Sequence, residues 1–242
     1  MPITNAQIVS FFENEVDLGI PTATRILLEN EGIASIDDLA EFYKDDVEGI
    51  ASTFRRMNPV VPFSAKCRKR LIEACELIRF YQTINRDISP GCIHWVAIKN
   101  FTQQWKSLKE RKEETPDAPK ITKELGILRW SEAFQDFLMR MIGLRMAPLA
   151  YVTRELVAEG GPRPAVVHNC PHSSEHLSVE GDLVAYATHA HPLYKDDNAK
   201  VYFYLEEAMR GTAFAASLKP FQRLKDGRGA YKAVIAQYAG VD

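Results

Sequence analysis

The stretch LKDGRGAYKAVIAQY, residues 224–238, is either a phosphate-binding loop or the start of a packed helix, and this choice decides how the fold of the chain is interpreted. Its acidic, glycine-rich start raises the question of a phosphate loop, whereas its second half has the apolar spacing of a packed helix. Both phosphate-loop patterns, GxxxxGK with Ser or Thr and GxGxxG after a strand, are missing, and Asp226 would repel an anion. We therefore expect Asp226 to cap a helix, and Gly227 and Gly229 to admit a close backbone. The expected packing face consists of Tyr231, Val234, Ile235 and Tyr238.

The rest of the chain has helical periodicity as well. It predicts short helices within residues 1–57, longer helices over 64–84, 93–114 and 125–141, and a further helix over 183–191. Ser35 and Asp38 have the spacing of a capping box, and Asp197 or Asn198 is the expected cap of a helix that stops at Gly211. Only the short runs PAVV and LVAYAT compete as strands. We predict an all-α chain.

The chain is predicted to have four segments. A small helical module covers residues 1–57, and a middle helical region of long helices covers 64–152. A loop or linker follows over 153–181, where proline, glycine and polar residues replace the helical pattern. Residues 182–242 form the last helical segment.

Composition excludes several classes of protein. The 242 residues have a formal net charge of −2 and a pI near 6.3, so no global basic field attracts nucleic acid. The sequence has no signal-peptide pattern, no apolar run long enough to cross a membrane and no CxxC pair among its four cysteines. We expect an intracellular, cytoplasmic protein with reduced thiols and no membrane partner.

The run HNCPHSSEH is the strongest hint of a metal site. His168, Cys170, His172 and His176 are residue types that bind zinc, but their spacing matches no zinc finger and HExxH is missing. A histidine-rich polar loop is the preferred interpretation, and a metal-dependent enzyme centred on it is the minor alternative. No nucleophile motif occurs, and the paired carboxylates stand at helix starts. We therefore predict no enzyme, catalytic residue, cofactor or small-molecule substrate.

A local basic cluster offers a nucleic-acid interface as an alternative to a solvated helix face. Its candidates are Arg55, Arg56, Lys66, Arg68, Lys69 and Arg70. The run LGIPTATRILLENEGI, residues 18–33, is also reminiscent of a phosphate-binding helix-hairpin-helix. Its hairpin has only Gly19, because Pro21 stands in place of the usual second glycine and removes a donor.

Three segments together carry a family resemblance. Residues 197–240, DNAKVYFYLEEAMRGTAFAASLKPFQRLKDGRGAYKAVIAQYAG, resemble the capsid portion of Gag-like polyproteins from copia-type retrotransposons, in the divergent form of algal genomes. Residues 23–56 resemble the sterile-alpha-motif type of module at the front of such proteins, and residues 134–155 resemble their middle segment. The match in the capsid-like segment is carried by Gly211, Pro220, Phe221, Asp226, Gly227, Arg228, Ala230, Tyr231, Tyr238 and Gly240.

The resemblance implies a non-enzymatic structural protein that forms homo-oligomers, with RNA as a further partner. The zinc knuckle expected after the capsid portion is missing, so we interpret the chain as the front piece of a Gag-like protein or a truncated remnant. A nucleic-acid-binding adaptor that uses the front module and the basic helices is the alternative function. For Arg228 we expect a hydrogen bond to a helix-end carbonyl or to a carboxylate such as Glu206 or Glu207.

Overall fold

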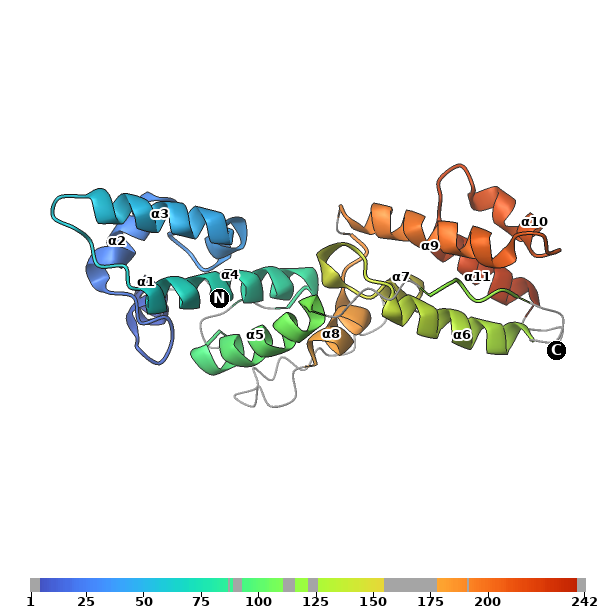
Figure 1. Ribbon diagram of the computed structural model, residues 1–242, viewed down its shortest axis with the longest axis horizontal. Coiled ribbons are helices and arrows are strands. Elements are labelled where there is room, and N and C mark those ends of the chain that lie inside the picture. The colour runs from blue at the N-terminus through green and yellow to red at the C-terminus, as the bar shows by residue number, and fades with distance from the viewer. Residues whose placement is uncertain are drawn as a thin grey trace. The chain divides into compact units, whose positions relative to one another are not determined.

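The predicted all-α fold is confirmed (Figure 1). The computed structural model describes residues 5–86, 88, 93–110, 116–121, 126–154, 178–190 and 192–238. Over these residues the regular elements are helices, apart from an isolated antiparallel bridge between Ile142 and Pro148. The run LVAYAT, which competed as a strand, lies in a helix and the two residues after it, whereas PAVV lies outside the described residues.

The helices are mostly short, and five of those in the described ranges exceed twelve residues. The elements of the first half are α1 (Asn5–Glu13), α2 (Thr22–Asn30), η1 (Asp37–Glu41), α3 (Lys44–Arg56), α4 (Ala65–Thr83) and α5 (Trp95–Lys109). Those of the second half are α6 (Ile127–Arg140), η2 (Leu144–Met146), α7 (Ala150–Thr153), α8 (Val179–Tyr186), α9 (Tyr194–Met209), α10 (Ala215–Leu218), η4 (Lys219–Phe221) and α11 (Gly227–Tyr238).

The described residues divide into two compact units. The first contains those up to 107 together with 178 and 179, and the second contains those of 108–154 and 180–238. The predicted boundaries at 57, 152 and 181 stay predictions. Helix α4 nevertheless packs on η1 and α3, so residues 65–83 share a core with the helices of the predicted front module.

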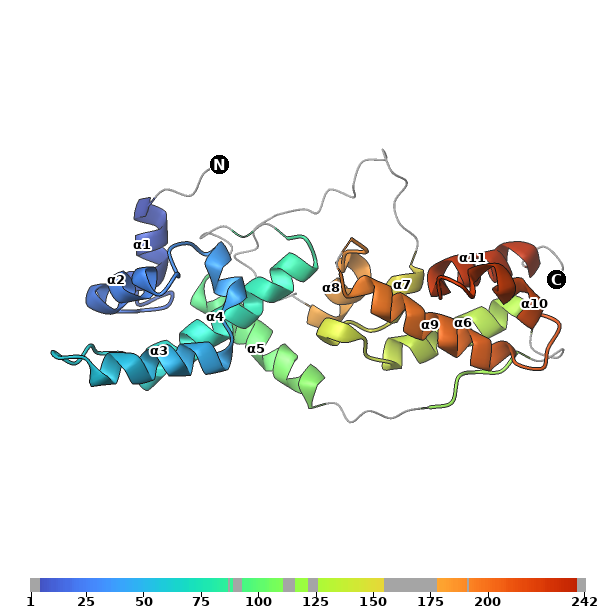
Figure 2. The ribbon, with the colours of Figure 1, turned by 90° about the horizontal axis from the view of Figure 1, so that it is seen from above.

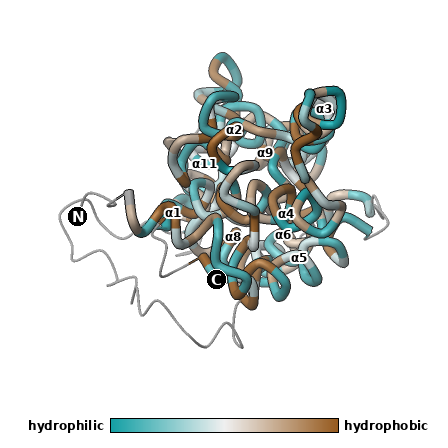
Figure 3. Tube along the Cα trace, turned by 90° about the vertical axis from the view of Figure 1, so that its left-hand side faces the viewer, coloured by the Kyte–Doolittle hydropathy of each residue, from teal (hydrophilic) through white to brown (hydrophobic). Residues whose placement is uncertain are grey.

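The first unit is built around α4. Ser64 caps this helix by accepting a hydrogen bond from the Cys67 amide, so the helix predicted over residues 64–84 begins at Ala65. Its apolar side, including Leu71 and Ile78, is fully buried. Phe80 stacks on Phe101 of α5 with ring centroids 5.1 Å apart, which joins the two long helices. Figure 3 shows much of α3 as hydrophilic, in keeping with a helix that buries one face only.

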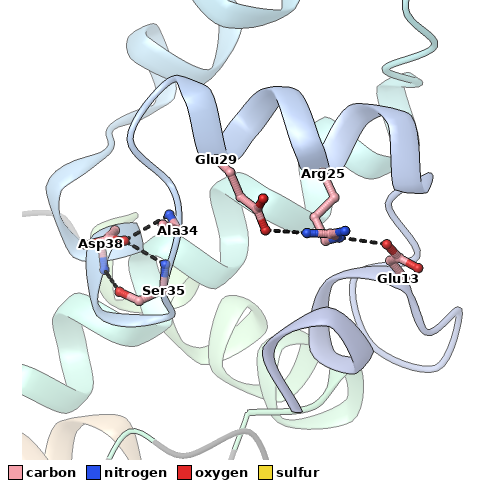
Figure 4. Close-up of polar contacts among 6 residues, drawn as sticks. All are labelled: Glu13, Arg25, Glu29, Ala34, Ser35 and Asp38. Atoms are coloured by element: carbon pink, nitrogen blue, oxygen red, sulfur yellow. Dashed lines mark hydrogen bonds and ion pairs between the residues drawn. The ribbon is translucent and has the colours of Figure 1, made fainter. Parts of the chain in front are cut away.

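Two polar joints fix the short helices of this unit (Figure 4). Arg25 on α2 donates to Glu13 of α1, at 2.6 Å, and to Glu29 one turn along its own helix. Asp38 accepts from the amides of Ala34 and Ser35, at 2.9 and 2.6 Å, while the Ser35 hydroxyl accepts from the Asp38 amide. The predicted capping box is therefore confirmed, although it opens the 3-10 helix η1 rather than an α-helix.

The second unit packs α9 and α11 against each other and both against α6 or α7 (Figures 1 and 2). The buried face of α9 carries Val201, Leu205 and Met209, as its spacing predicted. Rings from α6 and α11 continue this core, because Phe134 stacks both on Trp130 and on Tyr231. The Trp130 indole N–H donates to the Pro119 carbonyl at 2.8 Å, so this buried donor is satisfied.

Two predicted helix starts were wrong in this unit. Helix α9 begins at Tyr194 with Leu193 at the N-cap, so neither Asp197 nor Asn198 caps it. Pro192 precedes this start and limits how far the helix can extend backward, and Asp197 instead stands in the first turn. Helix α8 covers Val179–Tyr186 rather than residues 183–191, so it begins inside the predicted loop.

Candidate functional site

Asp226, Gly227 and Arg228, the DGR turn, stand at the start of α11 and are the centre of a set of polar contacts between helices. We call this set the polar junction; its residues are Tyr151, Arg154, His189, Asp197, Asn198, Asp226 and Arg228. Asp226 Oδ1 accepts from the Gly229 amide and from Asn198 Nδ2, each at 3.0 Å. The Asn198 Oδ1 atom in turn accepts from the Arg228 amide at 2.8 Å. Asp226 therefore caps α11, as predicted, and Asn198 ties that cap to α9.

Gly227 lies where α9 and α11 touch. A Cβ atom placed on it would lie 2.5 Å from both the Asn198 carbonyl oxygen and the Tyr202 amide nitrogen, which are backbone atoms of α9. The predicted close backbone approach is thus present at Gly227. It is absent at Gly229, where a side chain would instead meet the Asp226 carboxylate and the Phe221 ring.

Arg228 and Arg154 each hold the end of a helix. Arg228 donates to the carbonyls of Val152 and Arg154, at 2.9 and 2.5 Å, at the C-terminal end of α7. Arg154 donates to the carbonyls of Val184 and Ala187, at 2.9 and 2.7 Å, at the C-terminal end of α8. A cation suits the negative end of the helix dipole. The predicted bond from Arg228 to a helix-end carbonyl is confirmed. The alternative partners, Glu206 and Glu207 of α9, do not take part in these contacts.

Asp197 is the most buried charged side chain of the junction, with 1% exposure. Its Oδ1 accepts from the Leu144 amide at 2.8 Å, and its Oδ2 accepts from the Tyr151 hydroxyl at 3.0 Å. Burial raises the pKa of Asp197, while these two bonds oppose that shift. Gly143 leaves room for the carboxylate, because a Cβ there would lie 2.6 Å from Oδ2. Sequence reasoning missed this role, since an acid at a helix start resembles a cap.

His189 completes the junction as a neutral side chain. Its Nε2 lies 2.9 Å from the Tyr151 carbonyl oxygen, and its ring stacks on Tyr194 with centroids 4.4 Å apart. Burial lowers the pKa of His189 to about 4, and the cations Arg154 and Arg228 act in the same direction. The neutral ring donates its Nε2 proton to the carbonyl. This geometry suits helix packing.

The remaining residues of the capsid-like motif occupy mixed positions. Gly211, two residues after the end of α9, has a φ of +78°, which a glycine adopts without strain. Pro220 is exposed in η4, so it does not pack as expected, whereas Phe221 and Tyr231 are half-buried. The side chain of Tyr238 lies outside the described residues. Val234 is fully buried and Ile235 half-buried, in line with the predicted face.

The basic candidates of the first unit separate into two groups. Arg70 is buried, donates to the carbonyls of Glu15 and Asp17 at 2.9 and 3.0 Å, and lies over the Trp95 ring. Arg68 is half-buried and forms an ion pair with Glu48. Both therefore hold the fold instead of facing a nucleic acid. The exposed group consists of Arg55, Arg56, Lys66 and Lys69. Within it, the Nζ atom of Lys69 lies 3.8 Å from Oε1 of Glu73.

The hairpin around Gly19 does not offer amides to a phosphate. Gly19 has a φ of +62°, and its N–H donates to the Asn14 carbonyl at 2.9 Å. The Ile20 N–H donates to the Phe12 carbonyl at 2.8 Å. Both donors are used inside the unit, so the likeness to a helix-hairpin-helix has no support from this geometry.

The predicted metal candidates cannot be placed. His168, Cys170, His172 and His176 all lie outside the described residues. Among the residues that are described, no three His, Cys, Asp or Glu side chains gather as a metal site would require. Likewise, none of the described helices combines the length and the apolar character needed to cross a bilayer.

Comparisons with protein-family models, with curated proteins and with solved structures gave no match. The polar junction is therefore interpreted from its own contacts. Its side chains bind helix ends, amides and one another, and these bonds fasten α7, α8, α9 and α11 together.

Proposed function

We propose that this chain is a non-enzymatic, Gag-like structural protein that associates with copies of itself. The observation that carries the proposal is the internal use of the DGR turn. Asp226 caps α11, Gly227 touches α9 and Arg228 holds the end of α7. These three residues are the centre of the motif that resembles a capsid segment. A motif whose groups are engaged in packing supports a scaffold better than it supports a catalyst.

Molar mass in solution as a function of concentration tests this function. We expect light scattering to give a mass that rises above the 27.4 kDa of one chain as concentration increases. The rise should be reversible on dilution, because a structural protein of this kind assembles through repeated contacts between copies. A strictly monomeric chain at the highest attainable concentration would contradict the proposal.

A nucleic-acid-binding adaptor is the second candidate, and the charge of the first unit favours it. Between Glu48 and Glu73 the sequence has no acidic residue and six basic ones. Phe54 and Phe63, whose ring centroids are 5.9 Å apart, bring the end of α3 close to the start of α4. The four exposed cations therefore belong to one end of this helix pair.

Salt-dependent binding to RNA and duplex DNA tests the adaptor. Each ionic bond to a phosphate that a substitution removes should reduce the slope of log K against log salt by about 0.9 on duplex DNA. We expect Glu substitutions at Arg55, Arg56, Lys66 and Lys69 to abolish binding, while the exposed control Lys195→Glu leaves it unchanged. Binding that is absent, or insensitive to salt, would remove this candidate.

A further inference from the structure

In the second unit, α9 and the turn before α11 each expose one large apolar side chain. Phe203 is 47% exposed and Leu224, in the turn before α11, is 78% exposed. Lys225, next to Leu224 in this turn, connects the turn to α9, because its Nζ lies 4.6 Å from the centre of the Phe203 ring. We call Phe203, Glu207, Arg223, Leu224 and Lys225 the Phe203 surface. Figure 2 shows α9 along the outside of this unit, with α6 behind it.

Most other exposed large apolar side chains lack such a setting. Tyr43 also has a cation over its ring, the guanidinium of Arg79, and Leu128 also has a charged neighbour in the chain. Only at Phe203, among these three, does the cation over the ring stand next in the chain to a second exposed large apolar residue, Leu224. Single exposed apolar residues are common on proteins and need no partner. A ring with a charged turn beside it and a leucine in that turn is a larger apolar feature, of the kind that interfaces use as an anchor.

The Phe203 surface carries charges of both signs, and each sign belongs to a different segment of the chain. Residues 208–225 contain no acid and four basic residues, three of them in the segment 219–225. Glu207 lies one helical turn after Phe203, next to Glu206. The segment before α11 is therefore basic, and the neighbouring part of α9 is acidic.

This pattern is complementary to itself. In a twofold contact the same surface meets its own copy, so the basic turn of one chain faces the acidic turn of α9 in the other. The two Phe203 rings would then lie near the axis. A nucleic acid fits less well, because its phosphates would meet Glu206 and Glu207.

We propose that the Phe203 surface is a self-association contact and that its occupant is a second copy of this chain. The inference rests on the proposed self-association and names the surface that produces it. Two apolar side chains and their charged neighbours make a small interface. Such a contact is reversible and weak, as transient interfaces are.

Removal of the apolar anchor is the first test, on the full chain and by molar mass against concentration. We expect Phe203→Ser with Leu224→Ser to weaken self-association at least tenfold. The matched control Leu128→Ser, which changes an exposed leucine in the same unit, should leave the mass curve unchanged. Circular dichroism of each variant checks the fold.

Charge exchange is the second test and involves exposed residues only. Glu207→Lys alone and Lys225→Glu alone should each reduce self-association by like-charge repulsion. An equimolar mixture of these two variants should associate again, since each then faces its opposite charge. The chain with both substitutions should regain association as well.

The outcomes separate the inference from the function on which it rests. A monomeric wild-type chain would end both. A wild-type chain that associates, with surface variants that associate equally well, would overturn the inference and leave self-association standing. Surface variants that keep their mass curve but lose RNA binding would overturn it too, and would assign the surface to nucleic acid.

Discussion

Gly227 sets the distance between α9 and α11 by having no side chain. Any Cβ there meets two backbone atoms of α9 at 2.5 Å, and backbone cannot move aside as a side-chain tip can. We expect Gly227→Ala to destabilise the second unit by about 3 kcal/mol, at the upper end of the range for overpacking. Urea unfolding with hydrogen exchange read at α9 and α11 measures this.

Gly49 is the matched control for that substitution. It lies within α3, and a Cβ there would meet nothing within 4 Å. Gly49→Ala should therefore stabilise α3 by about 0.5–1 kcal/mol, because alanine loses less backbone freedom in a helix than glycine. If the two alanine variants changed the free energy of unfolding by the same amount, the close approach of α9 at Gly227 would not be what destabilises Gly227→Ala.

His189 makes the stability of the second unit depend on pH. Its pKa of about 4 in the folded state lies below the value near 6.5 of an unfolded histidine. Between these values the unfolded chain binds a proton that the folded chain does not, so stability falls as pH falls from about 6.5 to about 4. Asp197 acts in the opposite direction, since its raised pKa contributes stability that is lost as pH rises through it.

The variant His189→Gln isolates the contribution of the histidine. Glutamine can still donate to the Tyr151 carbonyl but does not titrate. We expect the urea midpoint of the second unit to fall less steeply between pH 7 and pH 4.5 in this variant than in the wild-type chain. Parallel pH profiles for the two proteins would show that folding does not lower the pKa of His189, contrary to this prediction.

At the scale of elements, guanidinium groups fasten helix ends that are far apart in sequence. Arg228 reaches the carbonyls that close α7, 74 and 76 residues before it. Methionine keeps much of the apolar stem but donates no hydrogen bond. We expect Arg228→Met to cost about 2 kcal/mol, the usual loss for bonds to a charged donor, and to speed amide exchange in residues 150–153.

Arg129→Met is the control for that loss of charge, because Arg129 is exposed on α6 of the same unit. It should leave both the urea midpoint and the exchange rates of α7 unchanged. Equal effects of the two substitutions would mean that net charge, and not the bonds to α7, stabilises this part of the protein.

The elements that the sequence predicts are those with local causes. Asp226 caps α11 through an amide three residues on, and Ser35 and Asp38 form their capping box over the same spacing, so local spacing identifies both. The bonds of Tyr151 to Asp197 and of His189 to Tyr151 span 46 and 38 residues. No local pattern encodes such pairs, which is why the junction was missed although its turn was found. Arg70 was misjudged for the same reason, since its partners lie 53 and 55 residues away.

At the scale of the whole molecule, the two units have separate cores. Phe54 of α3 is fully buried in the first unit and packs on Phe63, whereas Leu205 of α9 is fully buried in the second. A core substitution should therefore act within its own unit. The pattern bears on function as well, since self-association through α9 and phosphate contacts at α3 and α4 would then be separable by mutation.

Phe54→Ala and Leu205→Ala test this separation. The cavities should cost about 3–5 and about 3 kcal/mol, respectively. We expect Phe54→Ala to speed amide exchange in α3 and α4 and to leave α9 and α11 protected, and Leu205→Ala to do the reverse. Each variant serves as the control for the other, because both remove a buried side chain of a long helix. If either substitution exposed the helices of both units equally, the units would unfold as one, and functions assigned to one of them could not be changed without the other.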